Sequence, residues 1–166
     1  MIWNNIHDLA AFISAEQRHN DNTFVCVSGG FDPLHRGHGR NIRSSFWLAD
    51  ALVAIVNGDG FLQRKKGFVF MSLEERMEII DSLRCVDHVV AWDDGSQNVA
   101  GALKILRCNS FAKGGDRASP ADMAPEELWA CEEVGTKIVY GVGGFEKIQS
   151  SSWLLSKAPT YLIQGT

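Results

Sequence analysis

Residues 24–38 read Phe-Val-Cys-Val-Ser-Gly-Gly-Phe-Asp-Pro-Leu-His-Arg-Gly-His, and they are the most informative segment of the chain. Their apolar start is typical of a buried strand, and the glycine pair Gly29–Gly30 ends that strand. Two imidazoles, those of His35 and His38, follow where a helix is expected to begin, and both can become cationic near neutral pH. A strand-to-helix turn directs backbone N–H groups and the positive end of the helix dipole at one point, which suits a phosphate. We therefore interpret this segment as a site that handles a triphosphate.

The composition is that of one soluble globular domain, since 45% of the 166 residues are hydrophobic and 22% are charged. The net charge of -4 argues against a nucleic-acid partner, which usually requires a broad basic surface. The four cysteines show no CxxC pair or zinc-like spacing, so we expect free thiols and a cytoplasmic location. Residues 1–12 do not resemble a signal peptide, and no apolar run approaches the length of a membrane span, so no membrane partner is expected.

Segments typical of strands and helices alternate along the chain, which predicts a parallel sheet with helices on both faces. We expect an α/β fold with a Rossmann-like, doubly wound sheet of five parallel strands in a single domain. Residues 1–20 are expected to form an N-terminal helical extension, and residues 21–166 the domain itself. The expected strands are 24–28, 51–57, 86–92, 110–113 and 137–142, and the expected helices are 6–17, 37–48, 72–83, 96–106 and 125–134, with a short one near 150–152.

The segments rich in glycine, histidine, lysine and serine all follow expected strands. They are residues 29–38, 58–66, 113–117 and 141–152. Because ligands of such folds bind beyond the carboxyl ends of the strands, these four segments are expected to meet at one edge of the sheet.

The histidine pair has three interpretations. His35 and His38 could be structural, or they could be half of a metal site with Asp32 as a third ligand. An isolated HxxH pattern favours the structural interpretation, but Gly30 and Gly37 allow the backbone to approach a ligand closely. No other His or Cys cluster completes a metal shell. We therefore favour phosphate binding and expect no metal site in the protein itself.

Three other segments each allow a structural and a functional interpretation. Arg64-Lys65-Lys66 could be solvated surface or could neutralise phosphate charge. Gly114-Gly115-Asp116 could be a tight turn or part of the ligand site. Ser150-Ser151-Ser152 could only cap a helix, or could also hold a phosphate.

Taken together, these segments resemble the cytidylyltransferase-like nucleotidyltransferase superfamily. Its signature GxFDxxHxGH is matched by residues 30–38, and the resemblance covers residues 22–156. The pieces Arg84-Cys85-Val86-Asp87 and Lys113-Gly114-Gly115-Asp116 are most similar to the heptose-phosphate adenylyltransferase branch.

The resemblance implies that a phosphorylated acceptor attacks the α-phosphorus of a nucleoside triphosphate, which arrives with Mg²⁺, and that pyrophosphate leaves. By the matched positions, His35 and His38 would bind the triphosphate and stabilise the α-phosphorus, and Lys65 or Lys66 would neutralise phosphate charge. Arg76 and Arg84 would contact the triphosphate or the acceptor's phosphate. The residues that would bind the nucleotide are Gly30, Phe31, Asp32, Lys65, Gly114, Asp116, Ser150, Ser151 and Ser152.

The sequence also departs from the family pattern. Gly67-Phe68-Val69-Phe70 replaces a frequent Gly-Arg-Pro, which predicts a less polar acceptor loop. The Arg-Thr-x-Gly-Ile-Ser segment of glycerol-phosphate cytidylyltransferases is missing, which favours ATP over CTP. Residues 1–20 lie outside the match and are a candidate interface for a homodimer.

Three hypotheses follow. The first is an adenylyltransferase that acts on a sugar phosphate, and the second is a cytidylyltransferase that acts on a polyol or amino-alcohol phosphate. The third is a catalytically inactive nucleotide-binding regulator, against which the intact histidine pair argues. A dinucleotide-dependent oxidoreductase is excluded because the turn at residues 29–34 is not GxGxxG.

Overall fold

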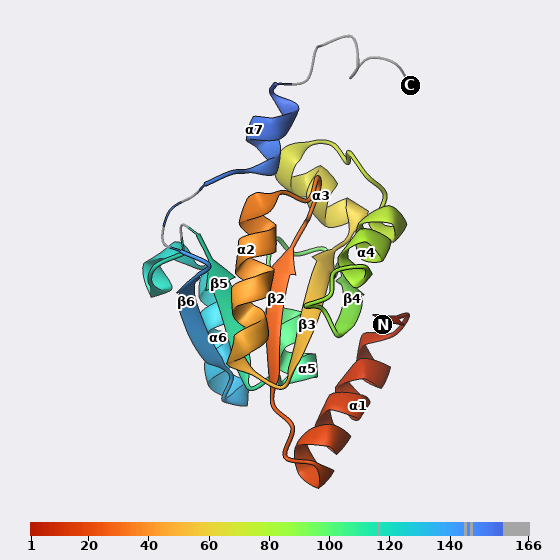
Figure 1. The fold of residues 1–166 in the computed structure, drawn as a ribbon, viewed down its shortest axis with the longest axis vertical. Helices are drawn as coiled ribbons and strands as arrows, with labels where there is room; N and C mark the ends of the chain where they lie inside the picture. The colour runs from red at the N-terminus through yellow and green to blue at the C-terminus, as the bar shows by residue number, and fades with distance from the viewer. Residues whose placement is uncertain (116, 145, 147, 158–166) are drawn as a thin grey trace.

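The structure is a computed structural model that describes residues 1–115, 117–144, 146 and 148–157. Within these residues, six parallel strands form one sheet in the order β1-β4-β3-β2-β5-β6 (Figure 1). The strands are β1 (Ile2–Trp3), β2 (Phe24–Gly29), β3 (Ala51–Asn57), β4 (His88–Trp92), β5 (Ser110–Gly114) and β6 (Lys137–Val142). The helices are α1 (Ile6–His19), α2 (Arg36–Ser45), α3 (Asp59–Lys66), α4 (Leu73–Asp81), α5 (Ala100–Leu106), α6 (Pro125–Val134) and α7 (Ser151–Leu155).

Helices cover both faces of the sheet, so the strands are apolar on both sides (Figure 1). Side chains alternate along β2: Cys26 packs in the layer of α1, α5 and α6, whereas Val25 and Val27 pack in the layer of α2 and α4. This arrangement confirms the expected single-domain, doubly wound α/β fold.

The sheet has six strands rather than five because Ile2–Trp3 adds a parallel edge strand beside β4. A strand of two residues is too short to produce a hydrophobic period in the sequence. The indole Nε1 of Trp3 donates a hydrogen bond of 3.2 Å to Nδ1 of His88. Leu9 and Ile13 of α1 are fully buried in the core. The first twenty residues, expected as a helical extension, therefore contribute both to the sheet and to the core.

Helix α3 was not expected, because Gly58-Asp59-Gly60 is typical of a turn. Asp93, which follows β4, accepts a hydrogen bond of 2.8 Å from the backbone N of Phe61 and pairs with Arg64 at 2.5 Å. An acceptor from a neighbouring strand thus satisfies an N–H of the first turn, as a helix cap would. A Cβ on Gly58 or Gly60 would lie 2.6 Å from a side-chain atom of Asp93, so both glycines make room for this contact.

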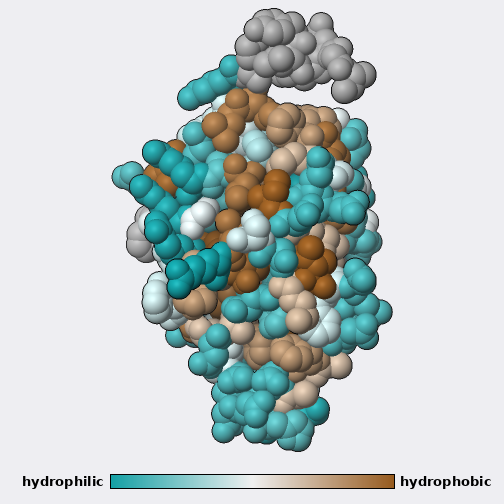
Figure 2. Space-filling view, turned by 45° about the vertical axis from the view of Figure 1, so that its right-hand side comes forward, coloured by the Kyte–Doolittle hydropathy of each residue, from teal (hydrophilic) through white to brown (hydrophobic). Residues whose placement is uncertain are grey.

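The two ends of the molecule differ in surface character. Figure 2 shows hydrophobic surface at the upper end, at the height where Figure 1 places the α3–α4 loop and α7, and a hydrophilic tip below, where α1 ends. The α3–α4 loop carries the exposed rings of Phe68 and Phe70. Among the described residues, no helix combines the length and the apolar character that crossing a membrane requires.

Candidate active site

A cavity of about 550 Å³ opens at the carboxyl ends of β2, β3 and β5. It lies where the strand order reverses between β2 and β5, which is the usual ligand position in doubly wound folds. The four sequence segments expected to meet do so here. The cavity is lined by Gly30, Phe31, Asp32, His35, His38, Lys65, Lys66, Gly114, Ser150, Ser151 and Ser152. Asp116 lies outside the described residues.

The two histidines stack at the start of α2. His35 caps the helix, and its Nδ1 accepts hydrogen bonds from the backbone N of Gly37 at 3.1 Å and of His38 at 3.4 Å. The neutral His35 ring therefore carries its proton on Nε2. The ring centroids of His35 and His38 are 3.7 Å apart, and the planes are inclined by 20°. The pair presents two imidazoles at one point on the cavity wall.

His38 is held as a neutral imidazole in the unliganded protein. Burial and, secondly, the nearby His35 lower the pKa of His38 to about 3. Its Nδ1 is buried with no hydrogen-bond partner among the described residues. The expectation that this ring is ready to become cationic near neutral pH is therefore corrected: it needs an added negative charge to do so.

Phe31 and Gly30 shape the turn that precedes the histidines. The backbone of Phe31 has a φ of 53°, in the left-handed region that bulky residues rarely adopt. Its ring is buried and packs edge to face against the His38 ring, with the two ring centroids 5.0 Å apart. A Cβ on Gly30 would lie 2.6 Å from Cδ2 of Leu62, so only glycine fits against α3 without a shift.

Asp32 anchors the α3–α4 loop to the motif. Its carboxylate is 2% exposed and accepts hydrogen bonds from Nζ of Lys66 at 2.7 Å, from N of Phe70 at 2.8 Å and from N of Met71 at 2.7 Å. Protein donors thus occupy both carboxylate oxygens. Lys66 remains part of the cavity wall while it is paired with Asp32.

Arg76 and Arg84, which the resemblance implies as phosphate contacts, are not among the residues that line the cavity. The guanidinium of Arg76 is fully buried and donates to the backbone oxygens of Gly30 at 2.8 Å and Asn57 at 2.6 Å. It also pairs with Asp59 at 2.6 Å, so it ties loops together beneath the site. Arg84 is exposed between α4 and β4, where the chain enters β4, at the edge of the sheet opposite the cavity.

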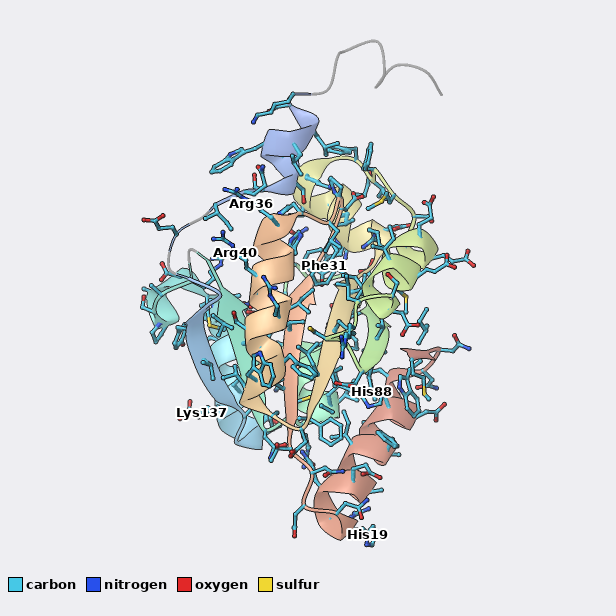
Figure 3. The ribbon with its side chains drawn as sticks, in the orientation of Figure 1. His19, Phe31, Arg36, Arg40, His88 and Lys137 are labelled. Carbon is cyan, nitrogen blue, oxygen red and sulfur yellow. The ribbon has the colours of Figure 1, made fainter. Side chains whose placement is uncertain are left out.

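The serine segment lies against the histidine turn. Ser150 caps α7 and accepts a hydrogen bond of 3.2 Å from N of Trp153, and Oγ of Ser151 donates to the backbone oxygen of Pro33 at 2.9 Å. Arg36 donates to the backbone oxygen of Ile148 at 3.4 Å. Figure 3 shows Arg36 and Arg40 on the side of α2 that faces the chain leading into α7.

The cavity wall also contains a lysine–glutamate pair that was not predicted from the sequence. Nζ of Lys113, on β5, lies 3.0 Å from Oε2 of Glu127, on α6, and both residues line the cavity. Glu127 shares the buried face of α6 with Ala130 and Cys131, three and four residues later. A carboxylate at an apolar position of a helix was the signal available in the sequence.

The family described as cytidylyltransferase-like matches residues 26–151, which is most of the chain. The chain belongs to this family. Its relatives include bifunctional proteins HldE from Citrobacter koseri, 34% identical over 120 residues (70% of this chain and 24% of that protein), and from Pelobacter propionicus, 30% identical over 158 residues (94% and 29%). They agree with the resemblance to the heptose-phosphate adenylyltransferase branch. The cytidylyltransferase-like chain spans less than a third of the length of these relatives.

Solved structures agree on the fold. The lipopolysaccharide core biosynthesis protein from Thermoplasma volcanium has a TM-score of 0.61 and 24% identity, and covers 72% of this chain and 95% of its own. The pantoate-beta-alanine ligase from Francisella tularensis has a TM-score of 0.58 and 14% identity, and the match covers 84% of this chain and 66% of that protein. At these identities the likeness supports the Rossmann-like fold of this family member and no more.

Proposed function

We propose that the chain is a nucleotidyltransferase that transfers AMP from ATP to a phosphorylated acceptor, specifically a sugar phosphate, and releases pyrophosphate. The observation that carries the proposal is the stacked pair His35 and His38 at the switch point of the sheet, in one cavity with Lys65, Lys66 and the serine segment. Membership of the cytidylyltransferase-like family supports the reaction type, and the relatives named HldE support the branch.

In the proposed reaction, an oxygen of the acceptor phosphate attacks the α-phosphorus of the triphosphate. A new P–O bond forms as the bond from the α-phosphorus to the bridging oxygen of the β-phosphate breaks, and pyrophosphate leaves with that oxygen. No covalent intermediate on the protein is required. The protein therefore contributes position and charge. The imidazoles and Lys66, which stays paired with Asp32, donate hydrogen bonds to the reacting phosphate, and Lys65 offsets its negative charge.

Magnesium belongs to the substrate in this proposal. No group of three or more His, Cys, Asp or Glu residues that could hold a metal occurs in the part of the chain that the structure describes. Mg²⁺ commonly binds through substrate phosphates and water with few protein ligands, so it would enter with the triphosphate and neutralise part of its charge.

Pyrophosphate release tests the proposal. The four nucleoside triphosphates are each assayed with sugar, polyol and amino-alcohol phosphates, and the expected pair is ATP with a sugar phosphate. CTP with a polyol or amino-alcohol phosphate is the alternative outcome. Triphosphate binding without release under any of these conditions would contradict the proposal and favour a regulator.

The His38→Ala variant tests the role of the pair in that assay. Turnover is expected to fall by about a hundredfold or more, which is the usual loss of one transition-state donor. His19→Ala is the matched control, because His19 is exposed on the last turn of α1 at the far end of the molecule (Figure 3). Near-normal turnover of His38→Ala would rule out the assigned role.

A further inference from the structure

The cavity continues around the carboxyl end of β5 onto the face of the sheet that α5 and α6 cover. Phe111 belongs to the core layer of these helices, and Lys113 lies on the same face, since its ammonium is near the Phe111 ring and Glu127 of α6. Nζ of Lys113 lies 4.4 Å from the Phe111 ring centroid. Glu127 in the first turn of α6 and Val99 at the start of α5 complete this part of the cavity wall.

The hydrogen-bonding capacity of the pair is only partly used. The Lys113 ammonium has three donors, and among the described residues one of them is bonded, to Oε2 of Glu127 at 3.0 Å. Oε1 of Glu127 accepts from the backbone N of Val99 at 3.2 Å, and each carboxylate oxygen can accept a second hydrogen bond. The side chains are only 15% and 9% exposed, so a ligand rather than bulk water would complete these bonds.

The charge of the pair disfavours an anion. Lys113 is already neutralised by Glu127, whose negative charge would repel a phosphate. Unpaired donors beside unpaired acceptors match hydroxyl groups, since each hydroxyl both donates and accepts. Buried ion pairs add little net stability compared with apolar residues, so stability alone does not explain a Lys–Glu pair in a cavity wall.

We infer that Lys113 and Glu127 recognise the hydroxyl groups of the acceptor's sugar, while its phosphate lies toward the histidines. This inference rests on the proposed nucleotidyltransferase function and names the part of the site that selects the acceptor. Val99 and Met123, which are buried in the same wall, supply apolar contact for the C–H face of a sugar ring. Gly114 lies on the opposite face of β5, close to Asn41 of α2, which leaves that side for the nucleoside.

The test compares Lys113→Met and Glu127→Gln with the unmodified protein in the pyrophosphate assay. Both variants are expected to raise KM for the sugar phosphate about tenfold or more, as expected for the loss of a charged hydrogen bond, with KM for the triphosphate unchanged. Lys104→Met is the matched control. Lys104 of α5 forms a Lys–Glu pair with Glu133 of α6, but on the surface and outside the cavity.

Deoxygenated acceptors separate recognition from structural support. Sugar phosphates that lack one hydroxyl should bind the unmodified protein more weakly, whereas at least one of them should lose nothing further in Lys113→Met. Equal losses in both proteins for every deoxy analogue would overturn the inference, as would a rise in KM for the triphosphate alone, which would place the nucleobase here. If Lys113→Met does not fold, the nearly isosteric Glu127→Gln gives the same comparison.

The two proposals fail in different ways. No pyrophosphate release by the unmodified protein with any triphosphate and acceptor refutes the proposed function. Release by the unmodified protein together with unchanged acceptor KM in both variants refutes only the assignment of Lys113 and Glu127.

Discussion

His38 combines a buried position with a neutral ring, and this has a measurable consequence. Because burial and the neighbouring His35 lower the pKa of His38 to about 3, the unliganded ring is a neutral imidazole at pH 7. A bound triphosphate brings several negative charges to the ring and raises this pKa. We predict that triphosphate binding takes up protons and that affinity increases as the pH falls from 8 to 6. Calorimetry in two buffers of different ionisation enthalpy measures the uptake directly.

The His38→Asn variant is the control for this prediction, because an amide keeps hydrogen-bonding capacity but does not titrate. It should take up fewer protons than the unmodified protein. Equal binding heats in both buffers, after correction for dilution, would show that His38 stays neutral in the complex.

The sequence predicted which side chains meet at the histidine turn but not their electrostatic state. The spacing of His35 and His38 places both at the start of one helix, which is a local property. The low pKa of His38 depends on burial against Phe31 and on the stacked geometry, which only the folded chain determines. The partners of Asp32 are similarly distant in sequence, since Lys66 and Phe70 come from another segment.

Arg76 holds four segments of the chain together. It bonds the ends of β2 and β3 through Gly30 and Asn57, the loop before α4 through the oxygen of Met71 at 3.0 Å, and α3 through Asp59. We predict that Arg76→Met lowers the free energy of unfolding by about 3–5 kcal/mol, because it leaves buried acceptors without donors. Urea denaturation followed by circular dichroism measures the change.

Arg84→Met is the matched substitution of an exposed arginine, and it should change the free energy of unfolding by no more than about 0.5 kcal/mol. The comparison separates the structural role of Arg76 from the phosphate contact that the family resemblance implied. An Arg76→Met protein with unchanged stability and weakened triphosphate binding would favour the phosphate contact.

Two features of the site escaped sequence analysis for the same physical reason. Helix α3 begins in a Gly-Asp-Gly segment, and the carboxylate of Asp93 that bonds its first turn lies 32 residues away from Phe61. Glu127 belongs to helix α6, which was expected, but its partner Lys113 lies on strand β5. Tertiary contacts of this kind override local propensity and leave little trace in a single sequence.

The alternation of strands and helices along the chain was sufficient to predict where the cavity lies. Parallel strands place their carboxyl ends at one edge, so the segments after β2, β3 and β5 meet there regardless of loop detail. The edge strand β1 could not be predicted, because pairing of Ile2 and Trp3 with β4 depends on α1 folding back across the core. The pairing of β1 with β4 and the buried side chains of α1 therefore join residues 1–20 to the rest of the chain.

We predict that residues 1–20 are required for a stable fold. Leu9 and Ile13 are fully buried in the core. Truncation of such a side chain typically lowers the free energy of unfolding by about 2–5 kcal/mol. Loss of both, together with β1, approaches the whole stability of a typical domain, about 5–15 kcal/mol. A chain that begins at Asp21 should therefore show no cooperative thermal transition, and Leu9→Ala in the full chain should show a lowered one. Arg18→Ala, at an exposed position of the same helix, should unfold within about 0.5 kcal/mol of the unmodified protein. A shortened chain that melts like the full protein would instead make residues 1–20 a separable extension, free to serve as the interface of a homodimer.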